Sequence, residues 1–181
     1  MQKKYIGLII GILILIVLAS GCIYFNSNNT KNTGYNTSIK TYSGNGINFN
    51  YPANWQLFQN PATGPTFSVS VFRYNSMNST GLWIYIMPSN ESTQDIINNM
   101  RNTVVPNGTI ISKGTLKIDG NTAYQVTGVD NSNGPTKNMR LEGISFVKNG
   151  KMYSFLLQAP NKDFDKEKQN FNLILNSFKI Q

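Results

Sequence analysis

The longest apolar stretch of the chain lies at its N-terminus. After Lys3 and Lys4, residues 5–25 carry no charge, and every residue from 8 to 18 except Gly11 is Ile, Leu or Val. A helix of this length extends about 31 Å, which matches the hydrocarbon core of a bilayer. The pattern predicts a hydrophobic N-terminal helix, either a signal peptide or a membrane anchor. The two lysines place the rest of the chain outside the cytoplasmic membrane.

Beyond residue 39 the hydrophobic pattern changes to short alternating segments. Apolar side chains occupy every second position of residues 47–51 and 67–71, as expected for strands with one buried face. Residues 82–87 are apolar at every position, which predicts a strand covered on both faces. Asp119-Gly120 and Asn149-Gly150 each separate two strand-like segments. Both dipeptides favour tight hairpins, so the neighbouring strands are predicted to be antiparallel.

Two segments have helical rather than strand periodicity. In the first, Ser92 and Asp95 form an N-cap pair, and Pro106 stops the apolar stripe that follows. The second lies near the C-terminus, with an apolar stripe and acidic residues that complement the helix dipole in its first turn. Its residues are Asp163, Asp165 and Glu167, with Phe164, Phe171, Ile174, Leu175 and Phe178 on the stripe. These elements predict an α+β fold in which helices flank a largely antiparallel sheet.

Three segments carry a family resemblance. Residues 46–55, with Gly46-Ile47-Asn48-Phe49 followed by Tyr51-Pro52-Ala53-Asn54-Trp55, resemble the opening of PsbP-like proteins, and residues 120–124 and 174–180 resemble two later segments of that family. The resemblance extends over roughly residues 40–181 and implies an α/β/α sandwich around the sheet. The best-known relatives are extrinsic subunits of photosystem II. Their metal-associated histidines have no counterpart here, because the chain contains no His, so a photosynthetic function is not carried over.

The N-terminal run ends in a segment that resembles the lipobox of prokaryotic lipoproteins. Ala19, Ser20 and Gly21 are small and precede Cys22, the single Cys of the chain, although Leu18 lies four rather than three places before it. Two outcomes stay open: Cys22 becomes the lipidated mature N-terminus, or the segment remains an uncleaved anchor. Together with the composition, this anchor resembles that of PsbP-related proteins of methanogenic archaea.

The chain therefore divides into three predicted parts. Residues 1–22 form the signal peptide with its lipobox, or the membrane anchor. Residues 23–38 are rich in Asn and Thr and predict a flexible linker, because they have too few apolar side chains to fold. Residues 39–181 form the PsbP-like domain. Five Asn-x-Ser/Thr sequons offer possible glycosylation sites on an exported protein, at Asn28, Asn36, Asn78, Asn90 and Asn107.

Charge and residue types restrict the chemistry that the chain can perform. The net charge of +8 is scattered, with no run of three Lys or Arg, so no concentrated surface for nucleic acid is indicated. Without His, and with one Cys, the chain has no imidazole ligand, no catalytic triad and no internal disulfide. The eight acidic residues show no paired arrangement for acid–base catalysis. We therefore expect no catalytic residue, cofactor or metal site.

Two classes of function remain. The first is a membrane-tethered, extracytoplasmic binding or assembly module that meets a protein partner at the membrane surface. The second is an extracytoplasmic enzyme whose site is not recognised. The loop of residues 130–135 is the predicted contact surface, since loops on a rigid sheet often carry function. The aromatic residues Trp55, Phe72, Tyr74, Trp83 and Tyr85 are expected to pack within and along the sheet, with a ligand pocket as the alternative.

Overall fold

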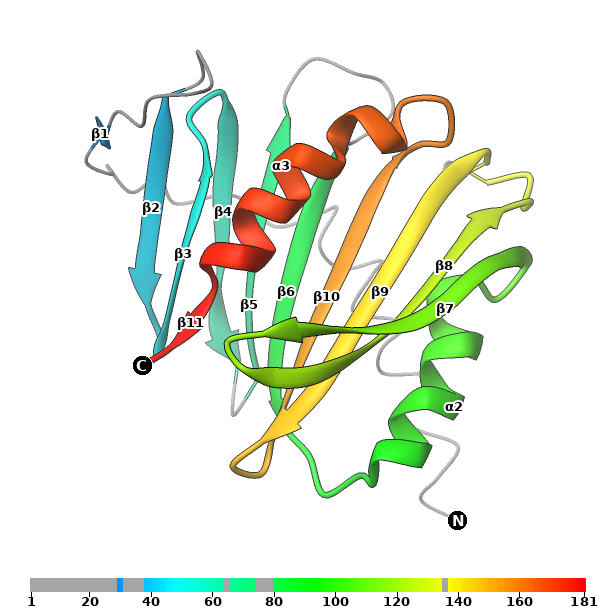
Figure 1. Ribbon diagram of the computed structural model, residues 1–181, viewed down its shortest axis with the longest axis horizontal. Helices are drawn as coiled ribbons and strands as arrows, with labels where there is room; N and C mark the ends of the chain where they lie inside the picture. The colour runs from blue at the N-terminus through cyan, green and yellow to red at the C-terminus, as the bar shows by residue number, and fades with distance from the viewer. Residues whose placement is uncertain (1–28, 31–37, 64–65, 74–79, 135–136) are drawn as a thin grey trace.

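A seven-stranded antiparallel sheet forms the centre of the molecule (Figure 1). The computed structural model describes residues 29–30, 38–63, 66–73, 80–134 and 137–181. The strand order is β4-β5-β6-β10-β9-β8-β7. The strands are β4 (Trp55–Thr63), β5 (Thr66–Arg73), β6 (Thr80–Pro88), β7 (Gly108–Ile118), β8 (Asn121–Asp130), β9 (Met139–Lys148) and β10 (Lys151–Pro160).

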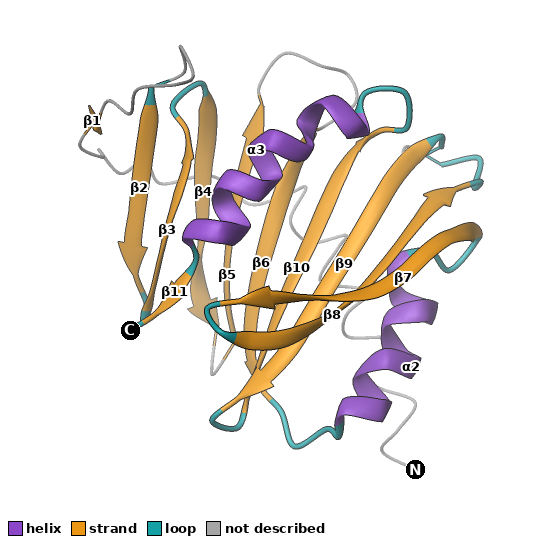
Figure 2. Cartoon of the chain, in the orientation of Figure 1, coloured by secondary structure: helices purple, strands orange, loops and turns teal. Residues whose placement is uncertain are grey.

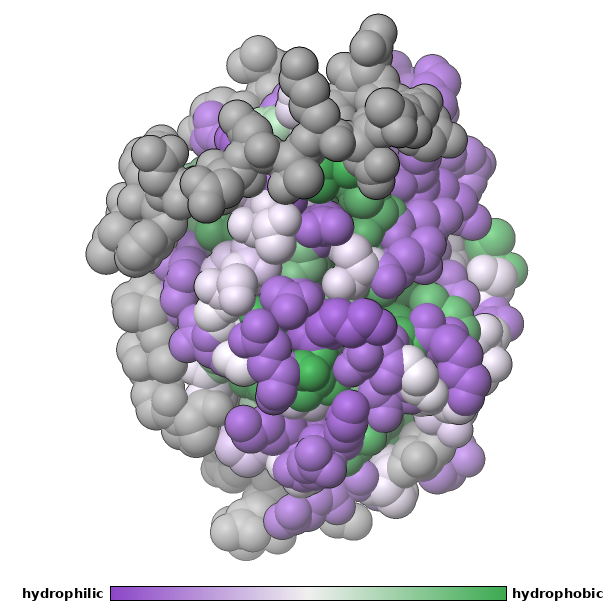
Figure 3. All heavy atoms as spheres, turned by 60° about the vertical axis from the view of Figure 1, so that its left-hand side comes forward, coloured by the Kyte–Doolittle hydropathy of each residue, from purple (hydrophilic) through white to green (hydrophobic). Residues whose placement is uncertain are grey.

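A smaller four-stranded sheet lies beside the β4 edge of the large sheet (Figure 2). Its order is β1-β2-β3-β11, and all of its pairings are antiparallel. The strands are β1 (Asn29–Thr30), β2 (Ile39–Gly44), β3 (Ile47–Pro52) and β11 (Lys179–Ile180). The sequence pattern predicted the β3 segment as a strand but did not separate it into a second sheet. Seen from the side of this small sheet, the surface is mainly hydrophilic (Figure 3).

Helix α3 (Phe164–Ser177) covers one face of the large sheet (Figure 1). Trp55 of β4 meets Phe171 of α3 edge-on at 5.8 Å between ring centroids. Phe155 of β10 meets Phe178, the residue that ends α3, at 4.9 Å. These rings belong to one continuous core shared by the helix and both sheets, so the part of the sheet beneath α3 is buried.

Helix α2 (Thr93–Val104) packs on the opposite face, over β8 and β9. Two glycines allow the C-terminal end of the helix to approach the strands closely. A Cβ on Gly143 would lie 2.3 Å from Val104 Cγ2, and a Cβ on Gly128 would lie 2.6 Å from Val105 Cγ2. Real Cβ atoms do not tolerate such distances, so both positions require glycine for the helix to pack as it does.

The local predictions for turns and caps are confirmed. Asp119-Gly120 and Asn149-Gly150 all have positive φ, between 48° and 76°, and each pair joins two antiparallel strands. The Ser92 side chain caps α2 by accepting a hydrogen bond from the Asp95 amide at 3.2 Å, and the helix ends at Val104, before Pro106. Asp163 is the N-cap residue of α3, although its side chain makes no capping hydrogen bond.

The predicted α+β sandwich around an antiparallel sheet is confirmed, because helices lie on both faces of the large sheet. Strand β6 is less covered than its all-apolar sequence predicted. Leu82, Ile84 and Ile86 are buried against α3, whereas the alternating side chains on the other face are half-buried. The predicted N-terminal hydrophobic helix lies outside the described residues. Among the residues that are described, no helix has both the length and the hydropathy to cross a bilayer.

Candidate functional site

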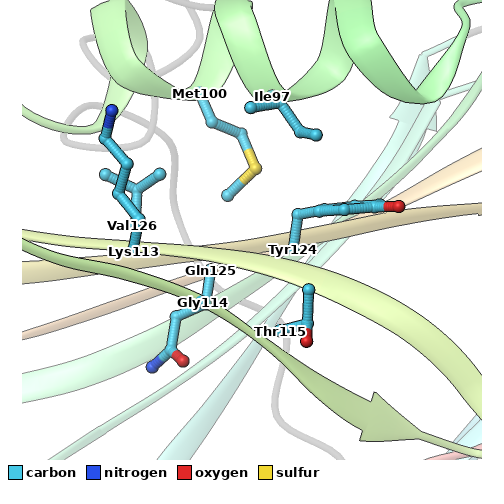
Figure 4. Close-up of a pocket in the computed structure, with 8 residues that line it drawn as sticks. All are labelled: Ile97, Met100, Lys113, Gly114, Thr115, Tyr124, Gln125 and Val126. Atoms are coloured by element: carbon cyan, nitrogen blue, oxygen red, sulfur yellow. The ribbon is translucent and has the colours of Figure 1, made fainter.

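A cleft of about 330 Å³ opens between α2 and the β7–β8 hairpin (Figure 4). Ile97 and Met100 point into it from the helix, toward Tyr124 and Val126 of β8. Figure 4 also shows that the Gln125 side chain points away from Met100, on the other side of the strands. The floor of the cleft is therefore apolar, and its helical wall comes from α2.

The sequence places these side chains by two different periodicities. Ile96, Met100 and Val104 recur at helical spacing and form the buried stripe of α2, so Ile97 lies at the border of that stripe. Tyr124 and Val126 are two residues apart in β8 and therefore share a face. The glycine contacts bring the C-terminal end of α2 onto the sheet, and the cleft opens further along the helix, beside Ile97 and Met100.

Polar groups stand at the β7 side of the cleft. Lys113 and Thr115 are exposed residues of β7 that line it, and Gly114 lies between them. The lining residues thus offer one ammonium group and two hydroxyls, those of Thr115 and Tyr124, around an apolar floor. None of the lining residues is an Asp, Glu or Cys. The arrangement can hold an apolar side chain and an anionic group, and its lining contributes no carboxylate or thiol.

A second hollow, of about 500 Å³, lies at the C-terminal end of α2. It is lined by Asn102, Val105 and Pro106 from the helix end, and by Gly108 and Ile110 from the first residues of β7. Both hollows therefore border the same strand. The described residues contain no group of three Asp, Glu or Cys side chains arranged to hold a metal ion.

One buried carboxylate stands apart from the cleft. Glu142 of β9 is 6% exposed, and Thr127 Oγ1 donates to its Oε2 at 3.3 Å. Burial raises the pKa of Glu142, against the opposing effects of hydrogen bonds from Gln125 and Thr127 and of the charges of Lys168 and Arg140. Glu142 shares its face with Leu157, on the α3 side of the sheet. It cannot reach a ligand in the cleft, which lies on the other face.

The carboxylate of Asp119 lies in an environment that lowers its pKa. It accepts hydrogen bonds from Lys179 Nζ at 3.1 Å and from the Ile180 amide at 3.2 Å, and Lys148 Nζ lies 3.7 Å away. Partial burial acts to raise its pKa, but these donors and the two ammonium charges hold the pKa of Asp119 below its usual value. The contacts connect the β7–β8 hairpin to β11, so they tie the large sheet to the small one.

Of the aromatic residues considered as a pocket, the four that the structure describes lie on two opposite faces of the sheet. Trp55 is buried in the core on the α3 face, as predicted. Trp83 and Phe72 are half-buried on the opposite face, with ring centroids 4.6 Å apart. Tyr85 lies on that face too, and burial raises its pKa to about 12. Tyr74 lies outside the described residues.

Asp130, the first residue of the predicted contact loop, accepts hydrogen bonds that fix the conformation of the loop. Asp130 Oδ1 accepts a hydrogen bond from the Ser132 amide at 2.8 Å, and its backbone oxygen accepts one from the Asn138 amide at 2.9 Å. The loop lies at the end of β8, next to the first residue of β7. Its last residue, Pro135, lies outside the described residues.

The predicted modification sites are only partly described. Asn90 and Asn107 are exposed, in the segments that precede α2 and β7. Asn28, Asn36 and Asn78 lie outside the described residues, as does Cys22. Sequence reasoning did not single out Ile97, Lys113 or Tyr124 as neighbours. The helical pattern indicated α2, but nothing in the pattern says over which strands the helix lies.

Comparison with known proteins identifies the fold family. Residues 6–180 match the family model described as PsbP-like protein, while no curated protein matches the chain. The solution structure of cyanobacterial PsbP (CyanoP) from Synechocystis sp. PCC 6803 aligns with a TM-score of 0.58 and 17% identity, over 85% of this chain and 98% of that one. The crystal structure of LpqN, involved in cell envelope biogenesis of Mycobacterium tuberculosis, aligns with a TM-score of 0.51 and 12% identity, over 86% and 91%.

The two perturbed carboxylates predict pH effects of opposite sign. Because the pKa of Glu142 is raised above 4.5 in the folded chain, its contribution to stability is greatest below that pH and is lost as the pH rises through the folded pKa. Glu142→Gln removes the charge that burial disfavours. We expect its unfolding midpoint to rise relative to the parent as thermal melts move from about pH 4 to about pH 8.

Asp119→Asn is the matched control, because Asn also tolerates the positive φ of that hairpin position. The depressed pKa of Asp119 gives stability that is present above 3.8 and is lost as the pH falls through the folded pKa. The variant should therefore be less stable than the parent near neutral pH, and the difference should shrink in acid. Equal pH dependence in both variants would contradict the assignment of the two environments.

Proposed function

Because the chain belongs to the PsbP-like family, we propose that it is a non-catalytic binding or assembly module, tethered at the outer face of the cytoplasmic membrane, whose partner is a protein. The cleft between α2 and β7–β8 is the surface at which the partner binds. The domain supplies a rigid antiparallel sheet. The residues that line the cleft come from α2 and from the β7–β8 hairpin, which forms one edge of that sheet.

The observation that carries this proposal is the composition of the cleft. An apolar floor made by Met100, Tyr124 and Val126 is open beside an exposed lysine. An apolar floor with a few polar groups at its rim suits recognition of a side chain or short segment. The buried carboxylate with a raised pKa, Glu142, lies on the opposite face of the sheet. The residues around the cleft are therefore suited to contact and orientation rather than to proton transfer.

The N-terminal sequence supports the location. Residues 5–25 carry no charge and follow two lysines, a pattern that directs the rest of the chain across the membrane. LpqN, which shares this fold, is involved in cell envelope biogenesis, and we extend an extracytoplasmic envelope role to this chain. A tether of this kind raises the effective concentration of the domain near a membrane-bound partner, so a small interface suffices.

Site-specific photo-crosslinking in native membranes tests the binding function. A photoreactive phenylalanine analogue in place of Thr115, an exposed residue that lines the cleft, should give a cross-linked adduct of discrete mass. The matched control carries the analogue in place of Asn172, an exposed residue of α3 on the other face, and should give none. Equal labelling at both positions, or turnover by the purified chain in a broad hydrolase and transferase screen, would contradict the proposal.

The tether is tested separately by mass spectrometry of the native protein. We propose that Cys22 is the mature N-terminus and carries lipid, since two acyl or ether-linked chains give stable anchoring. The expected spectrum lacks residues 1–21 and shows a lipid mass on the peptide that begins at Cys22. A peptide that retains Met1, or an unmodified Cys22, would contradict lipidation and leave an uncleaved anchor.

A further inference from the structure

Strand β7 is an edge of the seven-stranded sheet. Within the described residues it pairs with β8 on one side and with no strand on the other. Its 11 residues therefore direct alternate backbone N–H and C=O groups away from the sheet. Such an edge accepts an extended peptide as an additional strand, with the backbone giving affinity and the neighbouring hollows giving specificity.

Several side chains of β7 are exposed along this edge. All residues from 111 to 115 are exposed, and Ile111, at 54%, is the most exposed large hydrophobic residue in the described part of the chain. The register of the β7–β8 pair shifts between Ile110 and Ser112, so Ile111 sits in a bulge. It offers an apolar contact beside the second hollow, which Ile110 lines.

Lys113 and Lys117 give the same edge a positive charge. They are four residues apart in β7, so their side chains share the face that Thr115 and the cleft occupy. Lys117 Nζ donates to the neutral Thr122 hydroxyl at 2.7 Å. Within the described residues neither lysine forms an ion pair. Both ammonium groups are thus available to carboxylates on a bound segment.

This charge pattern disfavours one symmetric pairing of β7 with a second copy of the chain. If two β7 strands paired antiparallel about Thr115, Lys113 of one copy would lie opposite Lys117 of the other. Like charges directly opposite one another destabilise a strand pair, so this register of self-association is disfavoured. A segment with two carboxylates four residues apart places both on the face of these lysines and meets them favourably.

We propose that β7 binds an extended acidic segment of a partner protein as an additional strand of the sheet. Its backbone pairs with the free edge, its carboxylates meet Lys113 and Lys117, and an apolar side chain enters the cleft against Met100 and Tyr124. This inference rests on the proposed binding function and names the chemistry of the partner. It also predicts salt sensitivity, because exposed ion pairs weaken as ionic strength rises.

The test uses the full chain in detergent micelles and a displayed library of random peptides of about twelve residues, long enough to span an edge strand. Peptides selected for binding should carry two Asp or Glu residues four positions apart with an apolar residue midway between them, so that all three side chains share one face of the added strand. In hydrogen exchange they should protect amides of β7 and leave those of β4, the other edge strand, unchanged. Each selected peptide should bind more weakly as salt increases.

Charge reversal checks the lysines directly. Lys113→Glu combined with Lys117→Glu should weaken peptide binding about ten-fold or more, since two exposed attractions become repulsions. Lys151→Glu combined with Lys162→Glu, which reverses two exposed lysines away from β7, should leave affinity within about two-fold. Melting curves of both double variants establish that each remains folded.

The outcomes that would contradict strand addition differ from those that would contradict the proposed binding function. Selected peptides that are basic, or that protect a surface other than β7, would overturn strand addition while leaving a binding module. Failure to select any peptide would also overturn it. In that case the cross-linking at Thr115 still decides whether a folded partner surface, rather than an extended segment, occupies the cleft.

Discussion

The two faces of the seven-stranded sheet are covered by very different lengths of chain. On one face the 14-residue α3 and the small sheet bury a continuous core that includes Trp55, Phe155 and Phe178. On the other face the main cover among the described elements is α2, whose 12 residues extend about 18 Å. Residues 111–115 of β7, the edge strand on the side that α2 covers, are exposed.

Helix α2 covers its part of the sheet only because glycines let it approach. Gly128 and Gly143 admit Val105 and Val104 at distances that any Cβ would prevent. Further along the helix, Met100 and Tyr124 line the cleft. The packing of α2 on β8 and β9 therefore creates the candidate binding surface, and it places that surface beside the free edge of β7.

Local features were predictable from the sequence, and long-range ones were not. The hairpin at Asp119-Gly120 and the cap at Ser92 depend on neighbouring residues, so their dipeptide and spacing patterns identified them. Glu167 lies in the first turn of α3 as expected, but its carboxylate is also buried and paired with Arg73, 94 residues away. Likewise, the cleft depends on which strands α2 packs against, and the hydrophobic periodicity of the sequence does not specify those strands.

Amide hydrogen exchange of the protein in native membrane vesicles, compared with the purified chain in detergent, tests most directly whether the α2–β7 side meets a partner. We expect slower exchange in the vesicles for the amides of β7, Gly108–Ile118, because a bound segment occupies their edge. Strand β4, at the opposite edge of the same sheet, serves as the internal reference and should exchange equally in both preparations. Identical exchange of β7 in the two preparations, or protection confined to β4, would contradict a binding role for this surface.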